Sequence, residues 1–400
     1  MAITKLVHKW ERVTPVVFAR APDAANPSVS SGTYDPLAPE PDNRGFVPHS
    51  SGSAVLPIGL DEAVALAARP ESRVRLIRVD METAGTLFVT SANPAVLAVT
   101  SPASGSALPS TQEMLIKLRP VASGTTHLEV RFGSASGPII HRLQVVVNPL
   151  IDVRTVGHVP TINGAPFIDP ATGAPFAATS NRSDASIRAL IATANVIYFP
   201  YGIRFVLDAV IDRAGVLNGF KNQGMVDDLS NEFNRATALN RVANVVNAYF
   251  VPQIADGTAA NPINRTAGVA TSAITDSVSF GLFVADFTTS GQVIAHESGH
   301  LLNVVNDPTN EFLHINTKAD PAIPGTGRVV RDDIVSRRRL MYAFTNFLPD
   351  PNRAYRDDVG YTPLTPGGML SIKQLDNDKT DLEMKEVRKT AGRLGRPPGP

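Results

Sequence analysis

The sequence contains no cysteine among its 400 residues. Disulfides and thiolate metal sites are therefore excluded, and a bound metal ion would need His, Asp, Glu or Tyr as ligands. The chain also lacks a net charge, because 37 Lys and Arg residues balance 37 Asp and Glu residues. Nucleic acids and anionic membranes favour basic partners, so we expect no nucleic acid among the partners of this chain.

Long apolar runs are absent as well. No stretch approaches the roughly 18 apolar residues that cross a membrane, so we expect no membrane span. Residues 1–10 lack the run of about 7–15 apolar residues that marks a secretory signal. The compartment is left open between the bacterial cytoplasm and export by a signal-independent route.

Hydrophobic residues make up 43% of the chain, the usual share for a globular protein, which argues against general disorder. A chain of this length exceeds what one hydrophobic core usually serves, so we expect more than one domain. We also expect a monomer. The predicted divisions are an N-terminal arm and Pro/Ser-rich linker at 1–53, a first domain at 54–149, a second at 150–375 and a disordered tail at 376–400.

Short strands at even spacing dominate residues 54–149. Several alternate apolar and polar residues, as half-buried strands do, and Pro, Gly and Ser cluster between them. The candidate strands are 74–79, 87–89, 96–99, 114–118, 128–132 and 143–147. This pattern predicts an all-β sandwich. The turns within 90–96 and 121–126 resemble those of bacterial immunoglobulin-like modules.

Helical and strand patterns alternate after Pro149, which predicts an α/β or α+β domain. One helix is expected to begin at a cap formed by Ser183 or Asp184, and another to follow a cap at Thr289 or Ser290. The remaining expected elements are a helix at 225–238 and strands at 203–207, 245–251, 267–271 and 280–285.

His296 and His300 stand four residues apart on the last of these helices, so both imidazoles can face one metal ion. Glu297 lies beside them, where a carboxylate can accept a proton from a water whose pKa zinc lowers toward ~7. The pattern predicts an endopeptidase that uses zinc (Zn²⁺) and acts on a protein or peptide, with His296 and His300 as ligands and Glu297 as general base. A surface helix with two chance histidines is the plainer interpretation.

A catalytic zinc ion needs a third protein ligand. Three side chains that follow the helix are candidates: Asn306, Asp307 and His314. We favour His314 and keep Asp307 as the alternative, because the neutral amide of Asn306 binds zinc poorly.

The segment that begins at His296 resembles the long motif of the metzincin peptidases, His-Glu-x-x-His-x-x-Gly-x-x-His. Asn303 stands where that family has Gly, and Asn306 stands where it has the third His. Met341, followed by Tyr342, resembles the family's Met-turn, a methionine beneath the zinc. The resemblance implies an α+β metzincin-like zinc peptidase domain after the immunoglobulin-like sandwich.

Two other functions are compatible with the sequence. Because Asn306 departs from the motif, the chain could be a catalytically impaired, peptidase-like binding or adhesion protein. It could also be a delivered bacterial effector toxin, which the absence of cysteine and of a signal segment permits. Stoichiometric zinc would separate an intact site from an impaired one.

Overall fold

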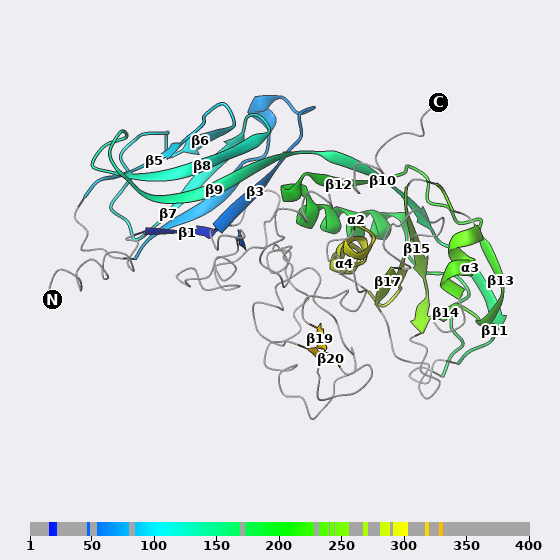
Figure 1. The fold of residues 1–400 in the computed structure, drawn as a ribbon. Coiled ribbons are helices and arrows are strands. Elements are labelled where there is room, and N and C mark those ends of the chain that lie inside the picture. The colour runs from blue at the N-terminus through cyan, green and yellow to red at the C-terminus, as the bar shows by residue number, and fades with distance from the viewer. Residues whose placement is uncertain are drawn as a thin grey trace.

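The structure is a computed structural model, and strand is more abundant than helix in the residues it describes. They form a β-sandwich followed by a unit of mixed sheet and helices (Figure 1). The described residues are 16–21, 46–48, 54–79, 85–168, 173–227, 232–239, 241–243, 245–255, 267–270, 281–288, 291–302, 317–319 and 328–330.

Two sheets make the sandwich and share one apolar core. Their strand orders are β1-β4-β7-β6 and β2-β3-β9-β8-β5. Burial alternates along β7 and β9, so each strand turns one side to the core, as the sequence pattern predicted. The strands are β1 (Val16–Arg20), β2 (Val47–Pro48), β3 (Ala54–Leu60), β4 (Ser72–Arg78), β5 (Leu87–Ser91), β6 (Leu97–Ser101), β7 (Glu113–Pro120), β8 (Gly124–Phe132) and β9 (Ile139–Pro149), with a short helix η2 (Leu66–Ala68).

Two segments of the predicted N-terminal arm belong to the sandwich. Strand β1 pairs antiparallel with β4, β2 pairs with β3, and Phe46 is fully buried in the core. The arm and linker predicted at 1–53 therefore contribute the segments 16–21 and 46–48 to the first domain. A segment this short is too brief to show a hydrophobic period, so its place in the core depends on partners distant in the sequence.

Strand β10 (Ile151–His158) follows β9 after a single residue and opens the main sheet of the second unit, with the order β12-β10-β15-β18-β17. Strands β10, β12, β15 and β18 are parallel, whereas β17 runs antiparallel to β18 at the edge. The bounds are β12 (Ile203–Leu207), β15 (Val246–Val251), β17 (Gly268–Ala270) and β18 (Leu282–Ala285).

Helices cover both faces of this sheet (Figure 1). α2 (Asp184–Tyr198) and α4 (Gly291–Leu301) lie on one face, and α3 (Glu232–Leu239) lies on the other. Ser183 caps α2 as predicted, since its hydroxyl accepts the Ser186 N–H at 3.2 Å. In the described part of the chain, no helix is both long and apolar enough to cross a membrane.

Shorter elements complete the unit. The 3₁₀ helix η3 (Phe199–Tyr201) directly follows α2. Three two-stranded pairs are β11 (Thr161–Ala165) with β13 (Val216–Asn222), β14 (Met225–Asp227) with β16 (Gln253–Ala255), and β19 (Thr317–Ala319) with β20 (Arg328–Val330).

The predicted helix at 225–238 is wrong in its first part. Met225–Asp227 forms strand β14, and the helix begins only at Glu232. The buried Glu232 carboxylate accepts the backbone N–H groups of Lys221 at 2.7 Å and Asp227 at 2.8 Å. This side chain ties the helix start to the preceding strands, a local interaction that apolar spacing does not reveal.

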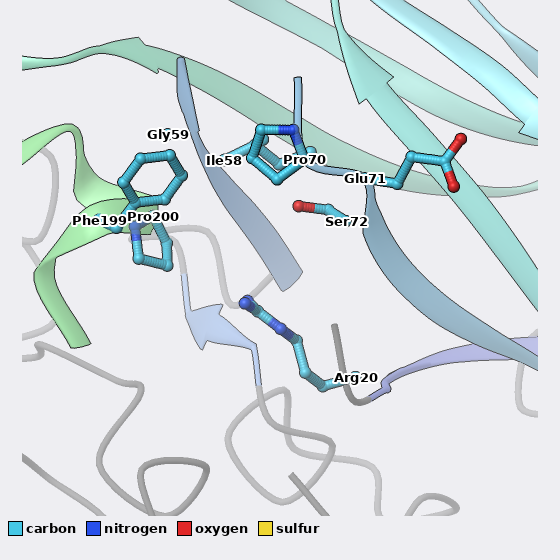
Figure 2. Close-up of a pocket in the computed structure, with 8 residues that line it drawn as sticks. All are labelled: Arg20, Ile58, Gly59, Pro70, Glu71, Ser72, Phe199 and Pro200. Atoms are coloured by element: carbon cyan, nitrogen blue, oxygen red, sulfur yellow. The ribbon is translucent and has the colours of Figure 1, made fainter. Parts of the chain in front are cut away.

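The sandwich packs directly on the second unit where β3 meets η3. A Cβ atom on Gly59 would lie 2.0 Å from the carbonyl oxygen of Phe199, so only glycine permits this approach. Arg204 of β12 also pairs with Asp61 across the boundary at 2.6 Å. Figure 2 shows the small hollow that is left beside Arg20, with room for about one water molecule.

Candidate functional site

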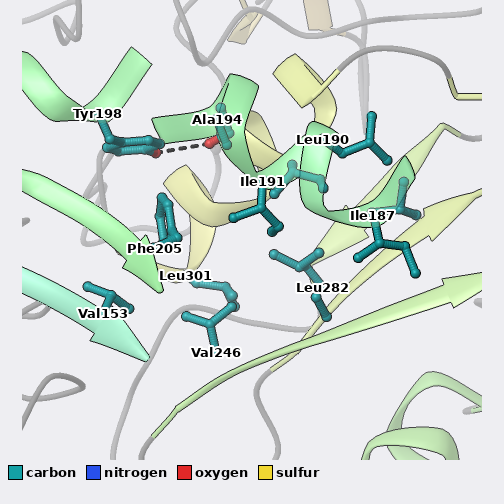
Figure 3. Packing of buried hydrophobic residues seen from close by; sticks show 14 of the residues in the cluster. Val153, Ile187, Leu190, Ile191, Ala194, Tyr198, Phe205, Val246, Leu282 and Leu301 are labelled. Atoms are coloured by element: carbon teal, nitrogen blue, oxygen red, sulfur yellow. Dashed lines mark hydrogen bonds between the residues drawn. The ribbon is translucent and has the colours of Figure 1, made fainter. Parts of the chain in front are cut away.

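Helix α4, which carries the predicted site, is fixed against α2 and the sheet. Ile294 and Leu301 are buried in the core that both helices share with the strands. Figure 3 shows Leu301 among the side chains of this core. The first residue, Gly291, packs so closely on α2 that a Cβ atom would lie 2.2 Å from the carbonyl oxygen of Leu190. The backbone of α4 is therefore held at both ends.

Tyr198 at the end of α2 provides a polar link to the middle of α4. Its hydroxyl donates to the carbonyl oxygen of Ala295 at 2.9 Å. The dashed line at Tyr198 in Figure 3 marks this bond. Complete burial raises the pKa of Tyr198 well above its ordinary value, so the hydroxyl keeps its proton and stays a donor. Ala295 immediately precedes His296, and the link therefore orients the part of the helix that carries the histidines.

His296 and His300 lie side by side on α4. Their ring centroids are 4.9 Å apart and the ring planes meet at 85°. His296 is 4% exposed, whereas His300 is partly exposed. The four-residue spacing thus places both imidazoles on one side of the helix, and the pair reaches solvent at His300.

Glu297 is buried between α4 and the edge strand β17. Its carboxylate accepts the backbone N–H of Ala270, and a Cβ atom on Gly268 would lie 2.9 Å from its Cγ. Burial raises the pKa of Glu297 to about 8, and the hydrogen bond from Ala270 opposes this effect. A carboxyl group with a pKa near neutrality can both accept and release a proton at physiological pH.

The metal-free protein is expected to lose stability as the pH rises from 4.5 to about 8. Glu297 has a pKa of 4.5 when unperturbed and of about 8 when folded, so between these values the unfolded chain has released a proton that the folded chain keeps. Raising the pH therefore favours unfolding, and this group can lower the free energy of unfolding by up to about 5 kcal/mol. Urea unfolding of the chelator-treated protein at pH 5 and pH 8 measures the loss.

Glu297→Gln is the matched variant, because it keeps the shape of the side chain and removes its titration. The difference in unfolding free energy between the two pH values should shrink in this variant. An equally large difference in the variant and the native chain would show that another group is responsible.

The remaining predicted site residues, Asn306, Asp307, His314 and Met341, lie outside the described residues. Within the described ranges, no three His, Cys, Asp or Glu side chains gather where they could hold a metal ion. The donor types present, two neighbouring imidazoles and an adjacent acid, fit a zinc site in chemistry and supply two of its three protein ligands.

Two residues near the site were not singled out from the sequence. Arg182 and Asp286 join the start of α2 to the turn before α4. The sequence offers little signal for them. Arg182 directly precedes the cap residue Ser183, and Asp286 directly follows a buried strand.

No protein-family model matches the chain, and no curated protein matches it. Solved structures that match include the S-layer protein rSbsC(31-844) and domains 4 and 5 of the S-layer protein SbsC, each at 16% identity and a TM-score of 0.16. The match covers 24% of this chain, and 11% and 46% of those two chains respectively. The chain thus covers less than half the length of each of these two structures.

The resemblance to the metzincin peptidases with a preceding bacterial immunoglobulin-like module is corrected by these findings. No family model supports it, and the described residues bring no three metal-ligating side chains together. The resemblance depended on two short motifs, at His296 and Met341. Motifs this short recur on unrelated folds, so they indicate chemistry more than ancestry.

Proposed function

We propose that the chain is a zinc-dependent endopeptidase whose site is built on α4. One observation carries the proposal: His296 and His300 lie side by side, with ring centroids 4.9 Å apart, next to the buried carboxyl group of Glu297. Two imidazoles and an acid in this order supply two zinc ligands and a proton acceptor.

His296 and His300 would hold the metal, with His314 as the proposed third ligand and Asp307 as its alternative. A bound zinc ion supplies Lewis-acid activation of water and of the peptide carbonyl group. The link from Tyr198 to Ala295 holds the helix turn that carries His296, so both imidazoles are oriented before any metal arrives.

Glu297 would move the proton. Peptide hydrolysis needs a proton taken from the attacking water and a proton delivered to the leaving nitrogen, and one carboxyl group can do both in turn. The backbone N–H of Ala270 holds this carboxyl group in place from the side of β17. Burial of the group also excludes bulk water that would compete for the proton.

Strand β17 offers a place for an extended substrate. It pairs with β18 along one edge, and among the described residues no strand pairs with its other edge. An extended peptide can add to such an edge through main-chain hydrogen bonds. Ala270 lies on β17 and contacts Glu297, so a peptide aligned there would pass beside the proton acceptor.

Zinc binding tests the proposal. The native chain, stripped with a chelator and dialysed against zinc, is expected to retain one zinc ion per chain by elemental analysis. His296→Ala and His300→Ala should each weaken binding by at least about a hundredfold, because even loss of a residue that only supports a ligand costs about 10–100-fold. His314→Ala should lose zinc, and Asp307→Ala should keep it.

His127→Ala serves as the control, since His127 is a partly buried histidine on β8 of the sandwich. Its zinc content should equal that of the native chain. If the native chain retains no zinc, or if His296→Ala binds it as tightly, the endopeptidase proposal fails. The peptidase-like binding protein is then the better interpretation.

A further inference from the structure

Arg182 connects the start of α2 with the turn that leads from β18 into α4. Its Nη2 lies 2.7 Å from the carbonyl oxygen of Ala285 and also donates to those of Asp286 and Thr288. The side chain is only 8% exposed, so these carbonyl groups have a protein donor where water has little access. One guanidinium group thus binds three carbonyl groups within residues 285–288.

Asp286 completes the connection from the side of the turn. Its carboxylate accepts the hydroxyl of Ser180 and the backbone N–H of Asn181, the latter at 3.1 Å. The Nε of Arg182 lies 3.6 Å from the same carboxylate. The three residues before the cap of α2 therefore all bind the turn before α4, and the ion pair is compensated by hydrogen bonds on both partners.

The same turn also holds the edge strand. The hydroxyl of Thr288 donates to the carbonyl oxygen of Ala267 at 2.9 Å, and the Ala285 N–H donates to that oxygen at 3.0 Å. Ala267 directly precedes β17, and Ala270 at the other end of this strand donates to Glu297. The turn therefore sets the position of the strand against which Glu297 rests.

The two histidines depend less on this turn. The link from Tyr198 to Ala295 and the buried contacts of α4 hold their part of the helix from the side of α2. Loss of the turn's support should therefore disturb the contact between Glu297 and Ala270 more than the pair His296 and His300.

We propose that Arg182, together with Asp286, is a positioning residue that acts through the turn and β17 to hold the Glu297 carboxyl group in place. The effect on hydrolysis rests on the proposed function. The effect on the contact between Ala270 and Glu297 does not.

Arg182→Met tests the inference, with Arg69→Met as a matched control. Arg69 makes the same kind of contacts in the sandwich, since it donates to the carbonyl oxygens of Val64, Pro120 and Val121. Arg182→Met should lower kcat by about 10–100-fold with KM and zinc content nearly unchanged, because small displacements of a reacting group cost rate. Amide exchange at Ala270 should accelerate about tenfold or more. Arg69→Met should show neither change.

The outcomes separate the two claims. If kcat and exchange at Ala270 in Arg182→Met both match the control, the positioning role is overturned. If the native chain hydrolyses no peptide, the proposed function fails, and exchange at Ala270 alone decides the positioning role. Should Arg182→Met not fold, Thr288→Val removes one hydroxyl bond at similar volume, and it must accelerate exchange at Ala270 for the inference to stand.

Discussion

Glu297→Gln is expected to lower kcat for peptide hydrolysis by about 100–10,000-fold while zinc binding stays close to that of the native chain. Glutamine keeps the size of the side chain and can still bond to the Ala270 backbone, but it cannot accept a proton from water. Glu297 is buried, and no further described carboxyl group gathers with it and the two histidines to take over the proton. Hydrolysis of casein by the zinc-loaded protein at neutral pH measures the effect.

Glu129→Gln provides the control for this prediction. Glu129 is a carboxyl group of similar burial, 4% exposed, that pairs with Arg131 and Arg142 in the sandwich. Its replacement should cost stability and leave kcat of the folded protein unchanged. Undiminished hydrolysis by Glu297→Gln would show that this residue is not the proton acceptor.

Gly59→Ala is expected to lower the free energy of unfolding by about 1–3 kcal/mol, the usual cost of an added methyl group without room. The new Cβ would lie 2.0 Å from the Phe199 carbonyl oxygen and 2.8 Å from its ring, so η3 would have to move away from β3. Because η3 continues from α2, this movement would press on the helix that supports α4. Urea unfolding of the full chain measures the change.

Gly157→Ala is the matched control for Gly59→Ala. Gly157 lies in β10, and the atoms nearest to an added Cβ, on Ile211 and Leu207, are 3.5 Å away, an ordinary contact distance. Its replacement should change the unfolding free energy by less than about 1 kcal/mol. Equal losses in both variants would mean that the close contact between Gly59 and Phe199 does not determine the loss of unfolding free energy.

The sequence predicted those elements whose structure depends on residues close together in the chain. The strand predicted at 203–207 is β12 with the same bounds, and the strands predicted for the sandwich correspond to β4 to β9, whereas β3 had not been predicted. The cap at Ser183 was predictable because it involves residues three apart. Within the site, the pairing of His296 with His300 followed from helix geometry alone.

The remaining features depend on residues distant in the sequence. Strand β10 was not predicted, and β14 was taken for part of a helix, since short apolar segments fit either structure. The burial of Glu297 requires β17, which only the folded sheet brings to α4. The bond from Arg182 to Ala285 joins residues 103 positions apart, so no sequence window contains it.

Strands β9 and β10 are separated by Leu150 alone, whose N–H donates to the carbonyl oxygen of Leu60 at 2.9 Å. The two units are therefore joined without a flexible linker, and this short connection fixes their relative orientation. If a substrate also bound the sandwich, the part bound there would lie at a fixed distance from His300. Under the proposed function, this fixed distance would help to select which bond is cleaved, together with the residues that flank the bond.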